Sequence, residues 1–162
     1  FVNTKKLNNI EFEFQTGGKS VYHKICINLM PHALSFFQSF FKKNFLENIS
    51  NINTRLVKKN TWQANFNFKK TNINLIFKEN FKEKKYLKLK LNDLILERKT
   101  SKNKIKFINY IKNYKTGKIK IIKNPMEQFY EELFKNLDNT KYYKSNKKLT
   151  FELMRINYSF LN

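Results

Sequence analysis

Residues 21–49 constrain the fold most, because they carry two different apolar periods separated by one proline. Apolar and polar residues alternate over residues 21–30, which is the two-residue period of a half-buried β-strand. After Pro31 the apolar residues recur every three or four positions, as an amphipathic helix requires. Pro31 lacks an amide donor and restricts the residue before it, so we expect it to end the strand and open a turn. The strand face holds Ile25, Ile27 and Leu29, and the helical stripe holds Leu34, Phe37, Phe41 and Phe45.

Charge narrows the classes of partner. The 162 residues include 33 Lys and Arg against 12 Asp and Glu, a net charge of +21. A/T-rich codons contribute to the number of lysines, but they do not explain the scarcity of acidic residues. Such a positive field favours a polyanionic partner, with nucleic acid first and an anionic membrane surface second.

Targeting signals and cysteines are the next constraint. Cys26 is the only cysteine, so an internal disulfide is excluded. No stretch has the length and apolar character of a membrane span, and the N-terminus resembles neither a signal peptide nor a transit peptide. We therefore expect synthesis inside an organelle with an A/T-rich genome.

The other expected elements follow from the same periods. A short strand at residues 10–14 should turn back at Gly17 and Gly18 towards the strand at residue 21. Further strands are expected from residue 61, at residues 73–77, at residues 87–96 and at residues 118–123, with a charged hairpin tip at residues 78–85. Ser101 can cap a helix over residues 102–114, and Asn124 and Pro125 can open another that reaches residue 137. The tail from Leu149 fits a strand or a helix equally well.

Catalytic chemistry has little support. The Gly18-Lys19-Ser20 triplet lacks the earlier glycine of a phosphate-binding loop, because Glu13 stands at that position. His23 and Cys26 would point to opposite faces of the predicted strand, so we expect no metal site and no cofactor. No paired carboxylates occur in an apolar setting. We therefore do not expect an enzyme.

Basic residues interleaved with aromatic residues are the remaining functional signal. Lysines bind phosphates as point charges, and aromatic rings can stack on unpaired bases. His32 is added because of the family resemblance given below, which implies a histidine at the turn into the first helix. The predicted RNA-binding residues are Arg55, Lys58, Lys59, Lys69, Lys70, Lys78, Lys82, Lys84, Lys85 and His32.

The order of these elements resembles one family, protein ten of the small ribosomal subunit, whose bacterial member is also called NusE. The resemblance covers residues 21–123 and lacks the proline-rich and hairpin signatures of the family. It is carried by Lys24-Ile25-Cys26-Ile27-Asn28-Leu29 before Met30-Pro31-His32, Lys84-Lys85-Tyr86, Asp93-Leu94-Ile95, Thr100-Ser101-Lys102 and Gly117-Lys118-Ile119-Lys120-Ile121.

This resemblance implies an α+β fold: a ferredoxin-like antiparallel sheet backed by two helices, with a long β-hairpin loop and, here, a C-terminal helical extension. The domains would be an arm and short strand at 1–20, the ribosomal-protein-like domain at 21–123 and the extension at 124–162.

The implied function is a structural constituent of an organellar, mitochondrial small ribosomal subunit in the mitochondrial matrix. Its partners would be ribosomal RNA and neighbouring proteins of the subunit head, with no small-molecule substrate. Two alternatives stay open: a peripheral basic subunit of a mitochondrial membrane complex that uses its charge on anionic lipid, and another mitoribosomal protein.

Overall fold

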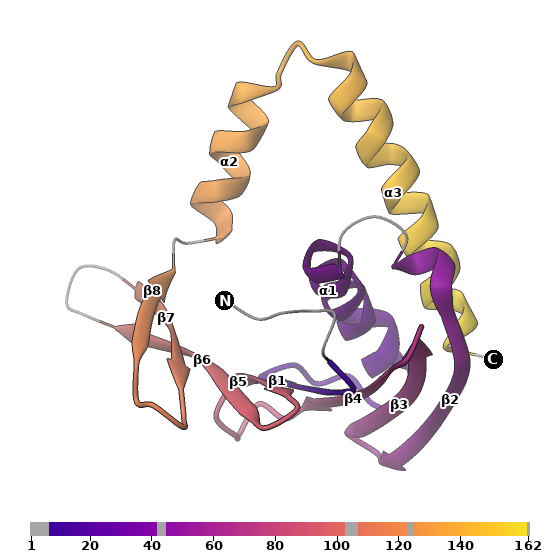
Figure 1. Ribbon diagram of the computed structural model, residues 1–162, viewed down its shortest axis with the longest axis vertical. Helices are drawn as coiled ribbons and strands as arrows, with labels where there is room; N and C mark the ends of the chain where they lie inside the picture. The colour runs from indigo at the N-terminus through magenta and orange to yellow at the C-terminus, as the bar shows by residue number, and fades with distance from the viewer. Residues whose placement is uncertain (1–6, 42–44, 103–106, 123–124, 162) are drawn as a thin grey trace.

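A computed structural model describes residues 7–41, 45–102, 107–122 and 125–161, and within them the strands form one eight-stranded mixed sheet (Figure 1). The strand order is β2-β3-β4-β1-β5-β6-β7-β8, so the first strand in the chain lies inside the sheet. β1 runs parallel to β4, and every other neighbouring pair is antiparallel. The strands are β1 (Asn9–Thr16), β2 (Ile49–Lys58), β3 (Thr61–Phe68), β4 (Thr71–Glu79), β5 (Tyr86–Leu91), β6 (Leu94–Lys102), β7 (Phe107–Asn113) and β8 (Ile119–Ile122).

The predicted strand at residues 21–30 is wrong, because this segment is the first half of the helix α1 (His23–Phe41), and Pro31 lies inside that helix. The buried side chains recur at helical spacing along the whole helix. Ile27, which the alternation placed on the buried strand face, is 49% exposed. The buried positions are Ile25, Cys26, Leu29, Met30, Ala33, Leu34 and Phe37.

The predicted helix at residues 102–114 is wrong as well. Residues 107–113 form β7, which pairs antiparallel with β6, and residues 103–106 of the predicted helix lie outside the described residues. The single strand expected at residues 87–96 is two strands, because Asn92 takes a positive φ of 50° in the turn between β5 and β6. Residues 50–60 are rich in Asn and Lys, which predicts a connection, but most of them belong to the edge strand β2.

The ferredoxin-like fold is therefore wrong, and the resemblance to ribosomal protein ten of the small subunit is wrong with it. Its expected first strand is a helix, and its expected second helix contributes strands to a larger mixed sheet. Several single elements are confirmed: β3, β4, β5, β8 and a helix beginning at Pro125. No observation tests the division of the chain at residues 20 and 123, which stays a prediction.

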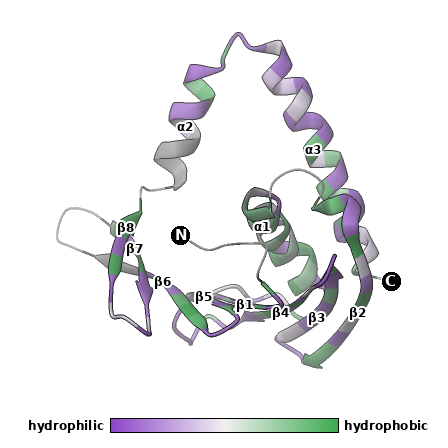
Figure 2. Ribbon diagram, in the orientation of Figure 1, coloured by the Kyte–Doolittle hydropathy of each residue, from purple (hydrophilic) through white to green (hydrophobic). Residues whose placement is uncertain are grey.

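The core lies between α1 and one face of β1, β3 and β4. Phe12 of β1 contacts Phe37 of α1 with ring centroids 5.6 Å apart, and Phe37 contacts Phe66 of β3 at 6.4 Å. The predicted core phenylalanines of the helical stripe are confirmed for Phe37 and Phe45, which are fully buried. Figure 2 shows α1 as largely hydrophobic, as a helix packed against a sheet should be.

The C-terminal part forms α2 (Pro125–Lys135) and α3 (Thr140–Ser159), joined by a turn. Of the two possibilities for the tail, the helical one is correct. Phe160, directly after α3, is fully buried, and its ring lies 5.3 Å from that of Phe66. α3 thus packs beside α1 at the β2–β3 end of the sheet, whereas α2 stands apart from it (Figure 1). None of the helices within the described residues is long and apolar enough to cross a membrane.

Candidate anion-binding site

The carboxyl end of β1 and the connection from β4 to β5 meet at one corner of the sheet. β1 and β4 are parallel and end side by side, with Thr16 opposite Glu79. Gln15 is buried, and its Nε2 donates hydrogen bonds to Glu83 Oε2 at 2.8 Å and to the Lys84 carbonyl at 3.2 Å. A buried amide with its partners satisfied fixes the segments that it joins. Gln15 therefore places the lysine-rich residues 82–85 beside the end of β1.

The loop after β1 is held by a second buried polar group. The backbone N–H of Ser20 donates to Glu79 Oε2 at 2.6 Å, and the N–H of Asn80 donates to the Thr16 carbonyl at 3.0 Å. A Cβ on Gly18 would lie 2.2 Å from Glu79 Oε2, so this position has no room for a side chain. The glycines predicted to turn the chain back into a hairpin instead form the loop between β1 and α1.

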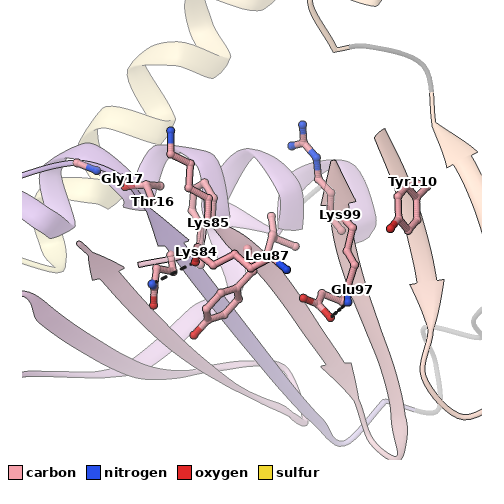
Figure 3. A pocket seen from close by; sticks show the side chains of 13 residues that line it. Thr16, Gly17, Lys84, Lys85, Leu87, Glu97, Lys99 and Tyr110 are labelled. Atoms are coloured by element: carbon pink, nitrogen blue, oxygen red, sulfur yellow. Dashed lines mark hydrogen bonds and ion pairs between the residues drawn. The ribbon is translucent and has the colours of Figure 1, made fainter. Parts of the chain in front are cut away.

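A cavity of about 780 Å³ lies at this corner, within the usual size range of ligand pockets (Figure 3). Its wall runs from the end of β1 across β5 and β6 to Tyr110 on β7. Four cationic residues and three aromatic rings contribute to it, with one glutamate. These are Lys84, Lys85, Arg98 and Lys99, then Phe14, Tyr86 and Tyr110, and Glu97.

The strand register decides which lining side chains share a face. Phe14 pairs with Leu87, and Leu87 pairs with Arg98, so these three side chains lie on one face of the sheet. The Phe14 ring contacts His32 of α1 at 5.9 Å, which identifies this as the face that α1 covers. An apolar floor of Phe14 and Leu87 therefore lies beside the Arg98 side chain, whose Nη2 donates a hydrogen bond to Asn109 Oδ1 at 3.4 Å.

The charge of the cavity wall is positive. Among the described residues, no carboxylate lies within ion-pair distance of Lys84 or Lys85. Glu97 is already engaged, because it pairs with Lys99 at 3.4 Å and accepts a hydrogen bond from Tyr114. Lys85 lies over Gly17, where its Cε would be 2.6 Å from an added Cβ. The unbalanced cations at the cavity suit an anionic group of a ligand.

The opposite face of β1 carries a second polar cluster. Lys78 Nζ lies 2.6 Å from Glu13 Oε1, and Tyr86 donates to the same carboxylate oxygen. Partial burial acts to raise the pKa of Glu13. The hydrogen bonds from Lys78 and Tyr86 act in the other direction and outweigh the burial, so the pKa of Glu13 is lowered. Burial and the bond to Glu13 both raise the pKa of Tyr86. This cluster binds β4, β1 and β5 together, so Lys78 already has a partner.

The structure distributes the predicted RNA-binding residues over separate places. Lys58 and Lys59 lie at one end of β3 and Lys69 and Lys70 at the other, so the two pairs do not form one site. Lys82, Lys84 and Lys85 lie together in the β4–β5 connection. His32 is an exposed residue of α1 whose ring contacts Phe14. Arg55 on β2 donates to Gln63 at 2.8 Å.

The sequence did not identify Arg98 and Lys99 as site residues. Both lie in β6, within the segment between the strand and the helix that were predicted there. The alternation of Leu94, Leu96 and Arg98 was the available signal. These three positions lie on one face of a strand, so a cation continues a row of apolar residues. Only the pairing with β5 shows that this cation faces the cavity.

The two histidines and the cysteine do not form a metal site. Among the described residues, no cluster of three His, Cys, Asp or Glu side chains could hold a metal ion. Cys26 is buried on α1, and burial raises the pKa of its thiol to about 12. It is a small core residue, since a thiol with this pKa is protonated at neutral pH.

No protein-family model and no curated protein matches the chain. Among solved structures, the chain is similar to KijD10, a 3-ketoreductase from Actinomadura kijaniata in complex with NADP. The TM-score is 0.48 and the identity 7%, over 93% of this chain and 49% of the ketoreductase. The chain thus spans about half the length of that protein. At this TM-score the likeness transfers neither a fold nor an activity to this chain.

The functional predictions made from the ribosomal resemblance are corrected with it. The fold that carried the resemblance is not present, because its expected first strand belongs to helix α1 and its expected second helix contributes the strand β7. The predictions of a mitoribosomal constituent and of ribosomal RNA and head proteins as partners are therefore wrong. The expectations of no small-molecule substrate and of no enzyme, which came from the absence of motifs, are corrected as well, since the cavity at the end of β1 has the size of a ligand pocket. The mitochondrial location is untested and stays a prediction.

Proposed function

We propose that the chain binds a small organic phosphate in the cavity at the end of β1. The observation that carries this proposal is the juxtaposition of Lys85 and Arg98 with the apolar floor of Phe14 and Leu87. The two cations would bind the phosphate, and the floor would receive the apolar body of the ligand. Of the lysines predicted from the sequence, Lys84 and Lys85 belong to this proposal.

Electrostatics and size both support a phosphate ester over a neutral ligand. Guanidinium and ammonium groups form charge-assisted hydrogen bonds to phosphate oxygens, and these are stronger than bonds between neutral groups. A cavity of about 780 Å³ exceeds the needs of an inorganic ion and fits a ligand with a ring system. The ring of Phe14, on the same face as Arg98, adds surface for a planar group.

Isothermal titration calorimetry with three probes tests this assignment. We expect 1-naphthyl phosphate to bind, and 1-naphthol and inorganic phosphate each to bind at least about ten-fold more weakly, because each lacks one half of the complementarity. Lys85→Gln with Arg98→Gln should weaken binding of 1-naphthyl phosphate by about ten-fold or more, since charged contacts are removed.

Lys69→Gln with Lys70→Gln is the matched control. It removes the same kind of charge from exposed positions at the opposite end of β3, so the affinity should stay unchanged. Absence of binding by 1-naphthyl phosphate would overturn the proposal. An equal loss of affinity in both double variants would also overturn it, because it would assign binding to net charge and not to the cavity.

A further inference from the structure

Helix α3 carries apolar side chains on two opposite faces. Leu149, Leu153, Ile156 and, after the helix, Phe160 pack against the core beside α1. Phe151, Met154 and Tyr158 recur at helical spacing on the other side and are 61%, 63% and 66% exposed. We call these last three residues the outer stripe of α3. A helix with a second exposed apolar stripe has a surface that fits a partner.

The outer stripe is bordered by basic residues. Lys144, Lys147, Lys148 and Arg155 are all exposed, and Lys147 Nζ lies 6.0 Å from the Phe151 ring centroid. The first turn of α3 contains no acidic residue, although acidic residues at that end would interact favourably with the helix dipole. Within α3 one of these cations is paired, since Lys148 Nζ lies 3.9 Å from Glu152 Oε1. A partner that is both apolar and acidic would complement the outer stripe and its basic border.

Helix α2 has the complementary chemistry. Phe134 is 67% exposed and Leu137, in the turn after the helix, is 54% exposed. Acidic residues gather at the C-terminal end of α2 and in that turn, where they oppose the helix dipole, whereas Lys135 in the last turn favours it. These acidic residues are Glu131, Glu132 and Asp138. The acids at the end of α2 and the bases of α3 are thus opposite in charge, so a contact between the two helices is electrostatically favourable.

Within one chain, α2 does not cover the outer stripe. The two helices diverge from the turn at residues 136–139 (Figure 1), and the side chains of the outer stripe stay exposed. An antiparallel contact between α2 of one chain and α3 of another would bring the acidic end of α2 to the basic first half of α3. It would bring Phe134 and Leu137 towards Phe151, the residue of the outer stripe nearest the start of α3.

We propose that a second copy of this chain occupies the outer stripe, with α2 of each copy docked on α3 of the other. Such an exchange obeys twofold symmetry, because each copy gives one acidic helix and receives another. The dimer is held by apolar burial and by the opposite charges of the two helices. The dimer does not involve the cavity at the end of β1, so a test of the dimer is independent of the proposed ligand.

Complementary charge reversal tests the exchange by analytical ultracentrifugation of the full chain. We expect a dimer for the wild type. One variant carries Glu132→Lys and Asp138→Lys on the α2 side, and the other carries Lys144→Glu and Lys147→Glu on α3. Each alone places like charges at both contacts, which should raise the dimer dissociation constant at least about ten-fold. An equal mixture of the two variants pairs opposite charges at both contacts and should dimerise again.

Two results would overturn the proposal. A monomeric wild type would show that no second copy binds, whether or not the chain then associates with anionic vesicles. Failure of the mixed variants to dimerise, with circular dichroism showing that each is folded, would exclude a contact between α2 and α3 of different copies. Phe151→Ser provides an uncharged check, because it should weaken the dimer without changing the charge.

Discussion

Lys78 Nζ lies 2.6 Å from Glu13 Oε1 and ties the parallel strands β4 and β1 together on the sheet face opposite α1. Tyr86 of β5 donates to the same oxygen, so three neighbouring strands share one carboxylate. The Glu13 side chain is only 15% exposed, so water does little to replace these contacts. Glu13→Gln should therefore lower the free energy of unfolding by roughly 1.5–3 kcal/mol near neutral pH, measured by urea denaturation.

The same carboxylate predicts how stability depends on pH. Folding lowers the pKa of Glu13. The ionised carboxylate therefore contributes to the free energy of unfolding at a pH above its unfolded pKa, and this contribution is lost as the pH falls through its folded pKa. The difference in melting temperature between wild type and Glu13→Gln should shrink between about pH 6 and about pH 3. Glu11→Gln, on the same face of β1, is the control. A difference that stays constant over this range would contradict the assignment.

Gly18 and Gly17 predict opposite results for the same substitution. Gly18→Ala would force the Glu79 carboxylate away from the Ser20 N–H, because the new Cβ would lie 2.2 Å from Glu79 Oε2. We expect a loss of about 1–3 kcal/mol in stability from the broken charged hydrogen bond. Gly17→Ala meets only the flexible Lys85 side chain and should be nearly neutral. Chemical denaturation of both variants checks the contrast, and equal losses would count against it.

Pro31 provides a test of the long helix. Inside α1 it has no N–H to donate to the carbonyl four residues earlier, and its ring strains the preceding turn. Pro31→Ala should therefore stabilise the protein, by about 1 kcal/mol or more, since proline disfavours a helix interior by roughly 3 kcal/mol. Thermal unfolding would measure the gain. A clear loss of stability would instead support a strand that ends in a turn at this position.

Phe160 anchors the end of α3 in the core. It is fully buried and contacts Phe66 edge to face at 5.3 Å. Phe160→Ala should cost about 3–5 kcal/mol, because it leaves a cavity between α3 and β3. Phe81→Ala is the matched control, since Phe81 is 60% exposed in the β4–β5 connection. If both changes had the same effect on the urea midpoint, α3 would not be docked through Phe160.

The amino-acid sequence determined the elements whose apolar period admits one interpretation. β3, β4 and β5 alternate clearly between buried and polar positions, and Pro125 opens a helix with a clear apolar stripe. It also predicted a cationic β4–β5 connection, where Lys84 and Lys85 line the cavity. In these segments local pattern and tertiary environment agree, so the residues themselves were sufficient.

Only the tertiary structure decided the segments whose pattern fits both periods. Ile25 and Leu29 are four residues apart, a spacing that lies on one face of a strand and also on one face of a helix, and packing against the sheet selected the helix. The placement of β1 beside β4 was not predictable either, because pairing between distant strands is set by the whole core. Arg98 entered the candidate site for the same reason: its register against Leu87 is a property of the folded sheet and not of its neighbours in the chain.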